Sequence, residues 1–72
     1  MLHANINDRV RLMHDIPEHL LQRGDVGVVR SVWFEPDAAY EVGFRTGKGA
    51  ETRVLVTPLQ VEKEAAPVLG EN

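Results

Sequence analysis

The residues best suited to hold a metal ion are crowded into one short stretch of the chain. Two histidines and two carboxylates, His14, Asp15, Glu18 and His19, fall close together. Zinc sites need ligands that converge from rigid elements, often with i, i+4 spacing on a helix. This stretch instead links the end of a predicted strand to a loop containing Pro17. We therefore expect a polar loop that holds no metal, and nothing in the sequence indicates another cofactor.

A second motif, Gly47-Lys48-Gly49, has the composition of a phosphate-binding loop. Such a loop needs a preceding glycine, a following Ser or Thr to bind magnesium, and a helix whose N-terminus faces the phosphate. Here Ala50 follows the glycine, and the residues after it are typical of a strand. The motif is therefore interpreted as the tip of a hairpin.

Groups that could catalyse acid–base or nucleophilic reactions are present but dispersed. The carboxylates stand at predicted strand ends and turns, where aspartate bonds the local backbone; they include Asp8, Asp15, Glu18, Asp25, Glu35 and Asp37. Ser31 lies within a predicted strand, without the motif of a nucleophile elbow. A small barrel also fills its interior with side chains. We expect no catalytic residue and no enzymatic activity.

Three aromatic residues, Trp33, Phe34 and Tyr40, flank the predicted turn at Glu35–Ala39. SH3-type modules use such aromatics to hold extended or proline-rich peptides. The alternative is that Phe34 and Tyr40 belong to the core and that Trp33 is a half-buried cover over it. Both interpretations stay open at this point.

Composition restricts the class of protein. The chain has 72 residues, 43% hydrophobic and 26% charged, with no cysteine. These values are typical of one small globular domain and exclude a disulfide scaffold or a thiolate zinc site. No apolar run approaches the roughly 20 residues that span a bilayer, and the N-terminus lacks the segments of a signal peptide. We expect a cytoplasmic protein with no membrane partner.

Charge is mixed along the chain. The net charge is −3, and no segment has a clear excess of Lys and Arg. Such an excess drives phosphate binding through counterion release. Nucleic acid is therefore not expected as a partner.

Alternating apolar residues predict strands throughout, separated by Gly- and Pro-containing turns. The predicted strands are 8–14, 26–34, 40–45, 52–57 and a short one at 61–63, with a 3₁₀ turn at 58–60 before the last. In the second strand the spacing of Val26, Val29 and Val32 requires a β-bulge if one face is to be buried.

Five short strands in a chain of this length predict an all-β fold, a small five-stranded SH3-like barrel. Residues 1–7 are an N-terminal lead-in, 8–63 form the barrel, and 64–72 are expected to be a disordered tail. The predicted core consists of Val10, Leu12, Leu20, Val26, Val29, Val32, Tyr40, Val42, Phe44, Val54, Val56, Leu59 and Val61.

Several local motifs resemble the small bacterial proteins grouped as domain of unknown function 4926. They are Asp8-Arg9-Val10, Asp15-Ile16-Pro17, Gly24-Asp25-Val26-Gly27, Tyr40-Glu41-Val42 and Phe44, within residues 7–63. The resemblance implies a compact SH3-like barrel and no particular activity. The glycine-centred strand is more distantly similar to KOW domains, and the overall layout to the SH3-like domain of nitrile hydratase β subunits.

Strand alternation also predicts an interaction surface. If the core residues point inward, then Met13, Trp33 and Leu55 point outward, and Val28 joins them depending on where the bulge falls. The leading hypothesis is a non-catalytic protein-interaction module, either a homodimer or an accessory subunit of a bacterial assembly. The alternatives are a KOW-like nucleic-acid-binding domain and an accessory or maturation subunit like that of nitrile hydratase.

Overall fold

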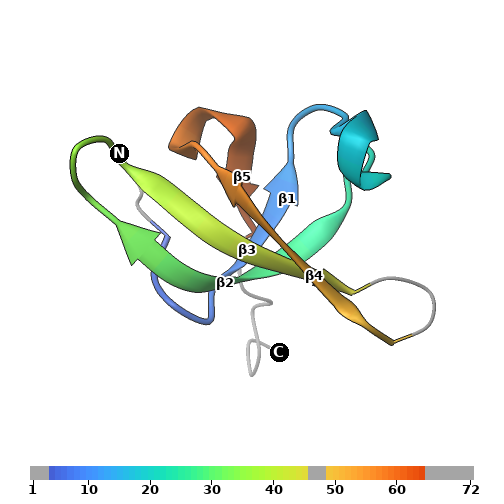
Figure 1. The fold of residues 1–72 in the computed structure, drawn as a ribbon, viewed down its shortest axis with the longest axis horizontal. Helices are drawn as coiled ribbons and strands as arrows, with labels where there is room; N and C mark the ends of the chain where they lie inside the picture. Colours follow the sequence, from blue (N-terminus) through green and yellow to red (C-terminus); the bar gives the residue numbers. More distant parts are fainter. Residues whose placement is uncertain (1–3, 46–48, 65–72) are drawn as a thin grey trace, which may run out of the picture.

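The computed structural model describes residues 4–45 and 49–64, and this part of the chain is all-β (Figure 1). Its elements in chain order are β1 (Arg9–Leu12), the 3₁₀ turn η1 (Pro17–His19), β2 (Val26–Trp33), β3 (Ala39–Arg45), β4 (Glu51–Val56), the 3₁₀ turn η2 (Pro58–Gln60) and β5 (Val61–Lys63). The five predicted strands and the 3₁₀ turn before the last are confirmed. The described residues include no helix that is long and apolar enough to cross a membrane.

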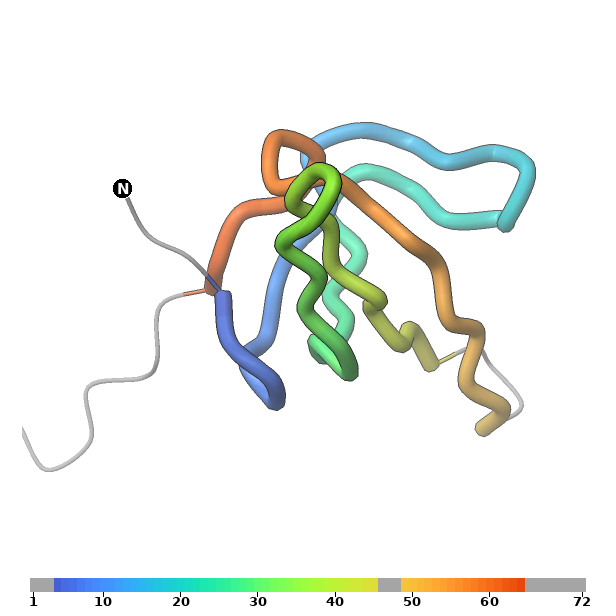
Figure 2. The backbone as a smooth tube through the Cα atoms, turned by 60° about the vertical axis from the view of Figure 1, so that its left-hand side comes forward, coloured from blue at the N-terminus to red at the C-terminus, as the bar shows by residue number. Residues whose placement is uncertain are grey.

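The strands form one antiparallel sheet in the order β4-β3-β2-β1-β5. The long strands β2 and β3 lie at its centre, and β4 and β5 are its edges. The sheet is strongly curved, so that β4 and β5 stand on opposite sides and η2 connects them (Figure 2). β3 and β4 pair as far as Arg45 and Glu51, which makes the segment between them the connection of a hairpin, as predicted. Residues 46–48 of this connection lie outside the described part.

The predicted bulge is present in β2. The register between β2 and β3 shifts between Val29 and Ser31, so Arg30 has no counterpart on β3. The extra residue allows both Val29 and Val32 to face inward, where Val29 pairs with Val42 and Val32 packs against the core. An irregular apolar spacing is thereby converted into one buried face.

The core lies on the concave side of the sheet. Its buried members are Ala4, Val10, Leu12, Ile16, Leu21, Val29, Tyr40, Val42, Phe44, Val54, Val56 and Val61. Nine of these were in the predicted core. Val26 was also predicted to be in the core, and this prediction is wrong. Its pairing with Arg11 places it on the outer face, where it is half-buried.

The prediction that Leu20 and Leu59 belong to the core is wrong. Leu20 is 91% exposed because its backbone adopts a left-handed conformation (φ 60°) at the end of η1. That turn directs the next residue, Leu21, inward, where its backbone pairs with buried Ile16. Leu59 is 90% exposed in the η2 turn, which is closed by the Gln60 side chain accepting a hydrogen bond from the Thr57 backbone.

The segments flanking the predicted barrel also contact the sheet. In the lead-in, buried Ala4 donates its backbone N–H to the Tyr40 hydroxyl at 3.2 Å, and Asn7 donates to the Val29 carbonyl. At the other end, the Glu64 backbone N–H donates to the Arg9 carbonyl. The rest of the predicted tail, residues 65–72, lies outside the described part.

Candidate functional site

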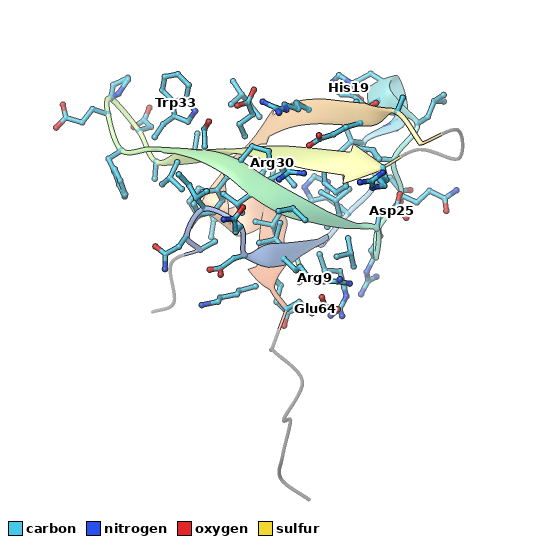
Figure 3. The ribbon with its side chains drawn as sticks, turned by 90° about the horizontal axis from the view of Figure 1, so that it is seen from below. Arg9, His19, Asp25, Arg30, Trp33 and Glu64 are labelled. Atoms are coloured by element: carbon cyan, nitrogen blue, oxygen red, sulfur yellow. The ribbon has the colours of Figure 1, made fainter. Side chains whose placement is uncertain are left out.

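The outer, convex face of the sheet carries the side chains that the core does not use. Figure 3 shows Trp33 at one end of this face, Arg30 near its middle, and Arg9 and Asp25 toward the other end. This order follows β2, which runs from Val26 to Trp33. The face thus has an apolar end around Trp33 and a charged region around Arg30.

The apolar end combines residues of β2 and β4. Trp33 is 51% exposed and Leu55 63%, while Phe34, the residue that follows β2, is 70% exposed. Trp33 pairs with Ala39 on β3, and Leu55 pairs with Glu41 of the same strand. Trp33 and Leu55 are therefore separated by β3 alone. One partner surface can contact both side chains. Phe34 is not in the core, which contradicts the alternative interpretation for that residue.

Tyr40 is buried, in agreement with the interpretation that it belongs to the core. The three aromatic residues around the turn therefore do not form one exposed cluster. Only 4% of Tyr40 is exposed, and its hydroxyl accepts the Ala4 N–H. Successive strand residues point to opposite faces, so Tyr40 packs inward while its neighbours on the sheet's outer side face solvent. The described structure therefore offers Trp33 and Phe34, without Tyr40, to any ligand.

The structure does not bring all four predicted interaction residues together. Arg11 pairs with Val26 at the start of β2, and Met13 follows Arg11 on the same face, hydrogen-bonded through its N–H to Gln60. The length of β2 thus separates Met13 from Trp33, roughly 20 Å at the usual strand rise. Val28 is half-buried and pairs with Arg9 and Gly43, away from Trp33. Of the predicted set, only Trp33 and Leu55 lie toward the same end of the sheet, paired from opposite sides with β3 positions two residues apart.

The charged region is a groove that sequence reasoning missed. It has a volume of about 250 Å³ and is lined by Arg9, Val26, Gly27, Val28, Arg30, Gly43, Arg45 and Glu51. Its arginines come from three different strands, and Arg11 and Arg53 stand beside it on β1 and β4. The signal available in the sequence was alternation: each of these arginines is next to a buried residue of its strand, and Arg11 lies between two of them, Val10 and Leu12.

One carboxylate of the chain lies in this groove. Arg30 Nε donates to Glu51 Oε2 at 2.8 Å, and Arg53 Nε lies 3.7 Å from the same oxygen. The hydrogen bond from Arg30, together with the charges of Arg30, Arg53 and Arg45, lowers the pKa of the Glu51 carboxyl below its ordinary value of 4.5. Gly43 lies underneath, where a Cβ atom would collide with the Glu51 carboxylate.

A second carboxylate, that of Glu64, lies just beyond the end of β5, beside β1. Glu64 accepts a hydrogen bond from Arg9 Nε at 2.7 Å and another from Arg11 Nη2 at 3.3 Å. With Glu51, it gives two glutamates held among five arginines on one face of the sheet. We name the groove together with Arg11 and Arg53 the arginine groove.

Aspartates in and around the histidine-containing loop hold the backbone of turns through hydrogen bonds. Asp15 Oδ1 accepts the Arg23 N–H at 2.8 Å, and Asp25 Oδ2 accepts the Gln22 N–H at 2.9 Å. Asp8 does the same for Asn5. These are the local backbone bonds expected of aspartate in turns. Within residues 4–45 and 49–64, no three His, Asp or Glu side chains are grouped so that they could hold a metal ion.

Comparison with known protein families places most of the chain within one family model. A family model described as Domain of unknown function (DUF4926) matches residues 6–62, most of the chain. No curated protein and no solved structure matches the chain.

Proposed function

The chain belongs to the family described as domain of unknown function 4926, and since that description names no activity, we propose a function from the geometry of the sheet. The protein is a non-catalytic interaction module that associates through the apolar end of its outer face. The observation that carries the proposal is the exposure of Trp33 and Leu55 on either side of β3.

Large apolar side chains gathered on the surface of a small domain commonly mark a contact surface. Tryptophan is the residue most enriched at the energetic centre of interfaces. Leu55 lies on β4, an edge strand of the sheet, so a partner can approach both the face and the edge at this point. Trp33 and Leu55 together give such a partner an apolar centre.

A second copy of the chain is the partner that this surface fits best. In a two-fold contact the same patch meets itself, so each charge must find its complement within the patch. Glu41 pairs with Leu55, and Arg53 occupies the next outward position on β4. A two-fold contact can therefore bring Glu41 of one copy to Arg53 of the other. A domain of this size also gains stability when it buries further apolar surface.

The arginine groove is the observation that favours the second candidate, nucleic-acid binding in the manner of KOW domains. It ranks lower because Glu51 and Glu64 lie among its arginines, and because a phosphate backbone needs many unneutralised cations. An accessory role like that of the nitrile hydratase β subunit would instead be recognised by co-purification with a metalloenzyme subunit.

Sedimentation and light scattering across a range from low to hundreds of micromolar test self-association. The wild-type chain should form dimers, and Trp33→Ser should be monomeric over the same range because the centre of the contact is lost. Leu59→Ser is the matched control, since Leu59 is 90% exposed in η2, away from the sheet face. It should leave the dimer intact, and both variants should melt as the wild type does at low concentration.

Two outcomes would contradict the proposal. A wild-type chain that stays monomeric at hundreds of micromolar does not self-associate through this surface. A dimer that Trp33→Ser leaves unchanged, or that Leu59→Ser dissociates, has its interface elsewhere.

A further inference from the structure

The arginine groove concentrates positive charge on a chain that is acidic overall. Five of the six arginines belong to it, Arg9, Arg11, Arg30, Arg45 and Arg53, and two glutamates neutralise part of their charge. The groove thus carries a formal charge of +3, whereas the remaining three basic and nine acidic residues carry −6. This separation of charge makes one face of an acidic protein attractive to anions.

The strand register gives the groove a low apolar floor between charged walls. One row across the sheet runs from Arg9 through Val28 and Gly43 to Arg53. The adjoining row begins with Arg11 and Val26 and ends with Arg45 and Glu51. Valines and a glycine therefore lie at the centre, and guanidinium groups lie on both sides.

The chain itself shows which chemical group this arrangement accepts. Both anions held by the arginines are carboxylates, and the Glu51 carboxylate lies directly over Gly43. Each guanidinium has five N–H donors, so one or two bonds to a glutamate leave most of them available. Arg45 lines the groove without forming any of the ion pairs of the described residues.

We propose that the arginine groove binds an acidic, partly apolar segment of a protein partner, one of whose carboxylates takes the place of Glu51 over Gly43. The partner's apolar side chains lie on Val26 and Val28, and its other carboxylates meet Arg9 and Arg45. Arginine suits this role because its planar fork matches a carboxylate with two parallel hydrogen bonds. The site lies away from Trp33; Arg53 borders both this groove and the proposed dimer contact, and binding of the segment through Arg9, Arg30 and Arg45 does not depend on dimer formation.

A protein segment fits the groove better than a nucleic acid does. The floor is aliphatic, whereas single-stranded nucleic acids are bound by aromatic platforms on which bases stack. Glu51 and Glu64 would repel a continuous phosphate backbone, while a segment with spaced carboxylates can avoid them. The acidic remainder of the surface adds to the repulsion of a long polyanion.

The test uses the full chain and a short fluorescein-labelled peptide in which glutamate and valine alternate, with binding measured by fluorescence anisotropy. Binding should be saturable and should weaken as salt is added. The double variant Arg30→Ala/Arg45→Ala should lose about tenfold or more in affinity, as expected when hydrogen bonds to a charged group are removed. Glu51→Gln should bind several-fold more tightly, because it no longer competes for the position over Gly43.

Arg23→Ala is the matched control. Arg23 is the one arginine outside the groove, and its backbone N–H donates a hydrogen bond to Asp15 Oδ1. This variant should bind the peptide as the wild type does. Trp33→Ser should do so too, which separates this site from the dimer surface. Circular dichroism and thermal melting confirm that each variant is folded.

Three results would overturn the proposal. Equal loss in Arg23→Ala and in the groove variant would show general charge attraction. Equal binding of a glutamine–valine peptide would show that the carboxylates are not recognised. Tighter binding of a single-stranded RNA of matched charge, lost in the groove variant, would identify the groove as a nucleic-acid site.

Discussion

The carboxylate of Glu51 lies over Gly43, in the space that a Cβ atom at position 43 would occupy. Glu51 reaches this position from the first residue of β4, while Gly43 pairs with Val28 on one side and Arg53 on the other. The missing side chain at Gly43 thus lets a carboxylate approach the sheet closely enough to meet Arg30. The glycine is part of the groove's structure, and this leads to the first prediction.

Alanine should be tolerated at Gly43 and not at Gly27. At Gly43 the three atoms nearest to the added methyl group all belong to the Glu51 side chain, which can rotate away, so the free energy of unfolding should change by less than about 1 kcal/mol. At Gly27 it meets Val42 Cγ1 at 2.6 Å, the Gly43 carbonyl oxygen at 2.8 Å and Phe44 Cδ1 at 2.8 Å. Overpacking of this kind costs about 1–3 kcal/mol.

Urea unfolding of the two variants checks this prediction. Equal destabilisation of Gly43→Ala and Gly27→Ala would contradict the prediction. It would mean that the Glu51 side chain cannot rotate away from position 43. In a folded Gly43→Ala chain, loss of the Arg30–Glu51 ion pair should also appear as a changed environment of the Arg30 guanidinium in NMR spectra.

The two phenylalanines should respond very differently to truncation. Phe44 is 1% exposed, so Phe44→Ala should destabilise the fold by about 3–5 kcal/mol and largely unfold so small a domain. Phe34 is 70% exposed, and Phe34→Ala should change the melting temperature little. Thermal melting followed by circular dichroism compares them directly. A Phe44→Ala chain that melts with the wild type would place Phe44 outside the core.

The free energy of unfolding should decrease at acid pH, in part because Glu51 becomes protonated. Its hydrogen bond with Arg30 lowers its pKa in the folded state, so its contribution is fully present above the ordinary value of 4.5 and is lost as pH falls through the lowered folded value. Glu51→Gln should therefore flatten the dependence of unfolding free energy on pH in this acid range. Asp8→Asn should have a similar effect below 3.8, because the Asn5 N–H bond lowers the pKa of Asp8.

Arg30→Gln provides the control for Glu51. It removes the first cause of the lowered pKa, so it should flatten the acid dependence as Glu51→Gln does. The double variant should show no further flattening, because both changes remove the same interaction. Fully additive effects of the two changes would mean that Glu51 owes its lowered pKa to a different neighbour.

The sequence determined which face is buried for most of the sheet, with Val26 at the start of β2 as the exception. In an extended chain, side chains alternate strictly, so a local pattern of apolar residues is enough to place Val10, Val42 and Val54 inside. The same local rule required a bulge within β2, which the structure places between Val29 and Ser31, and the proline before Leu59 indicated the 3₁₀ turn. These features depend on residues a few positions apart, which is why they could be predicted.

The burial of loop residues could not be predicted from this alternation. Leu20 and Leu21 are chemically identical, and alternation gives no rule where the strand has ended. The choice between them is made by the left-handed backbone of Leu20 and by the pairing of Leu21 with Ile16. Both features belong to the folded loop, and the pattern of apolar residues in the sequence does not predict either of them.

Only the tertiary structure decided which outward residues are neighbours. Alternation placed Met13, Trp33 and Leu55 on the outer face, but the strand register separates Met13 from the other two by the length of β2. The same register gathers arginines from positions 9 to 53 into one groove, although no segment of the chain is basic. Local pattern fixes the face of a side chain, whereas its neighbours depend on how segments distant in the sequence pair, and that is set by the packing of the whole core.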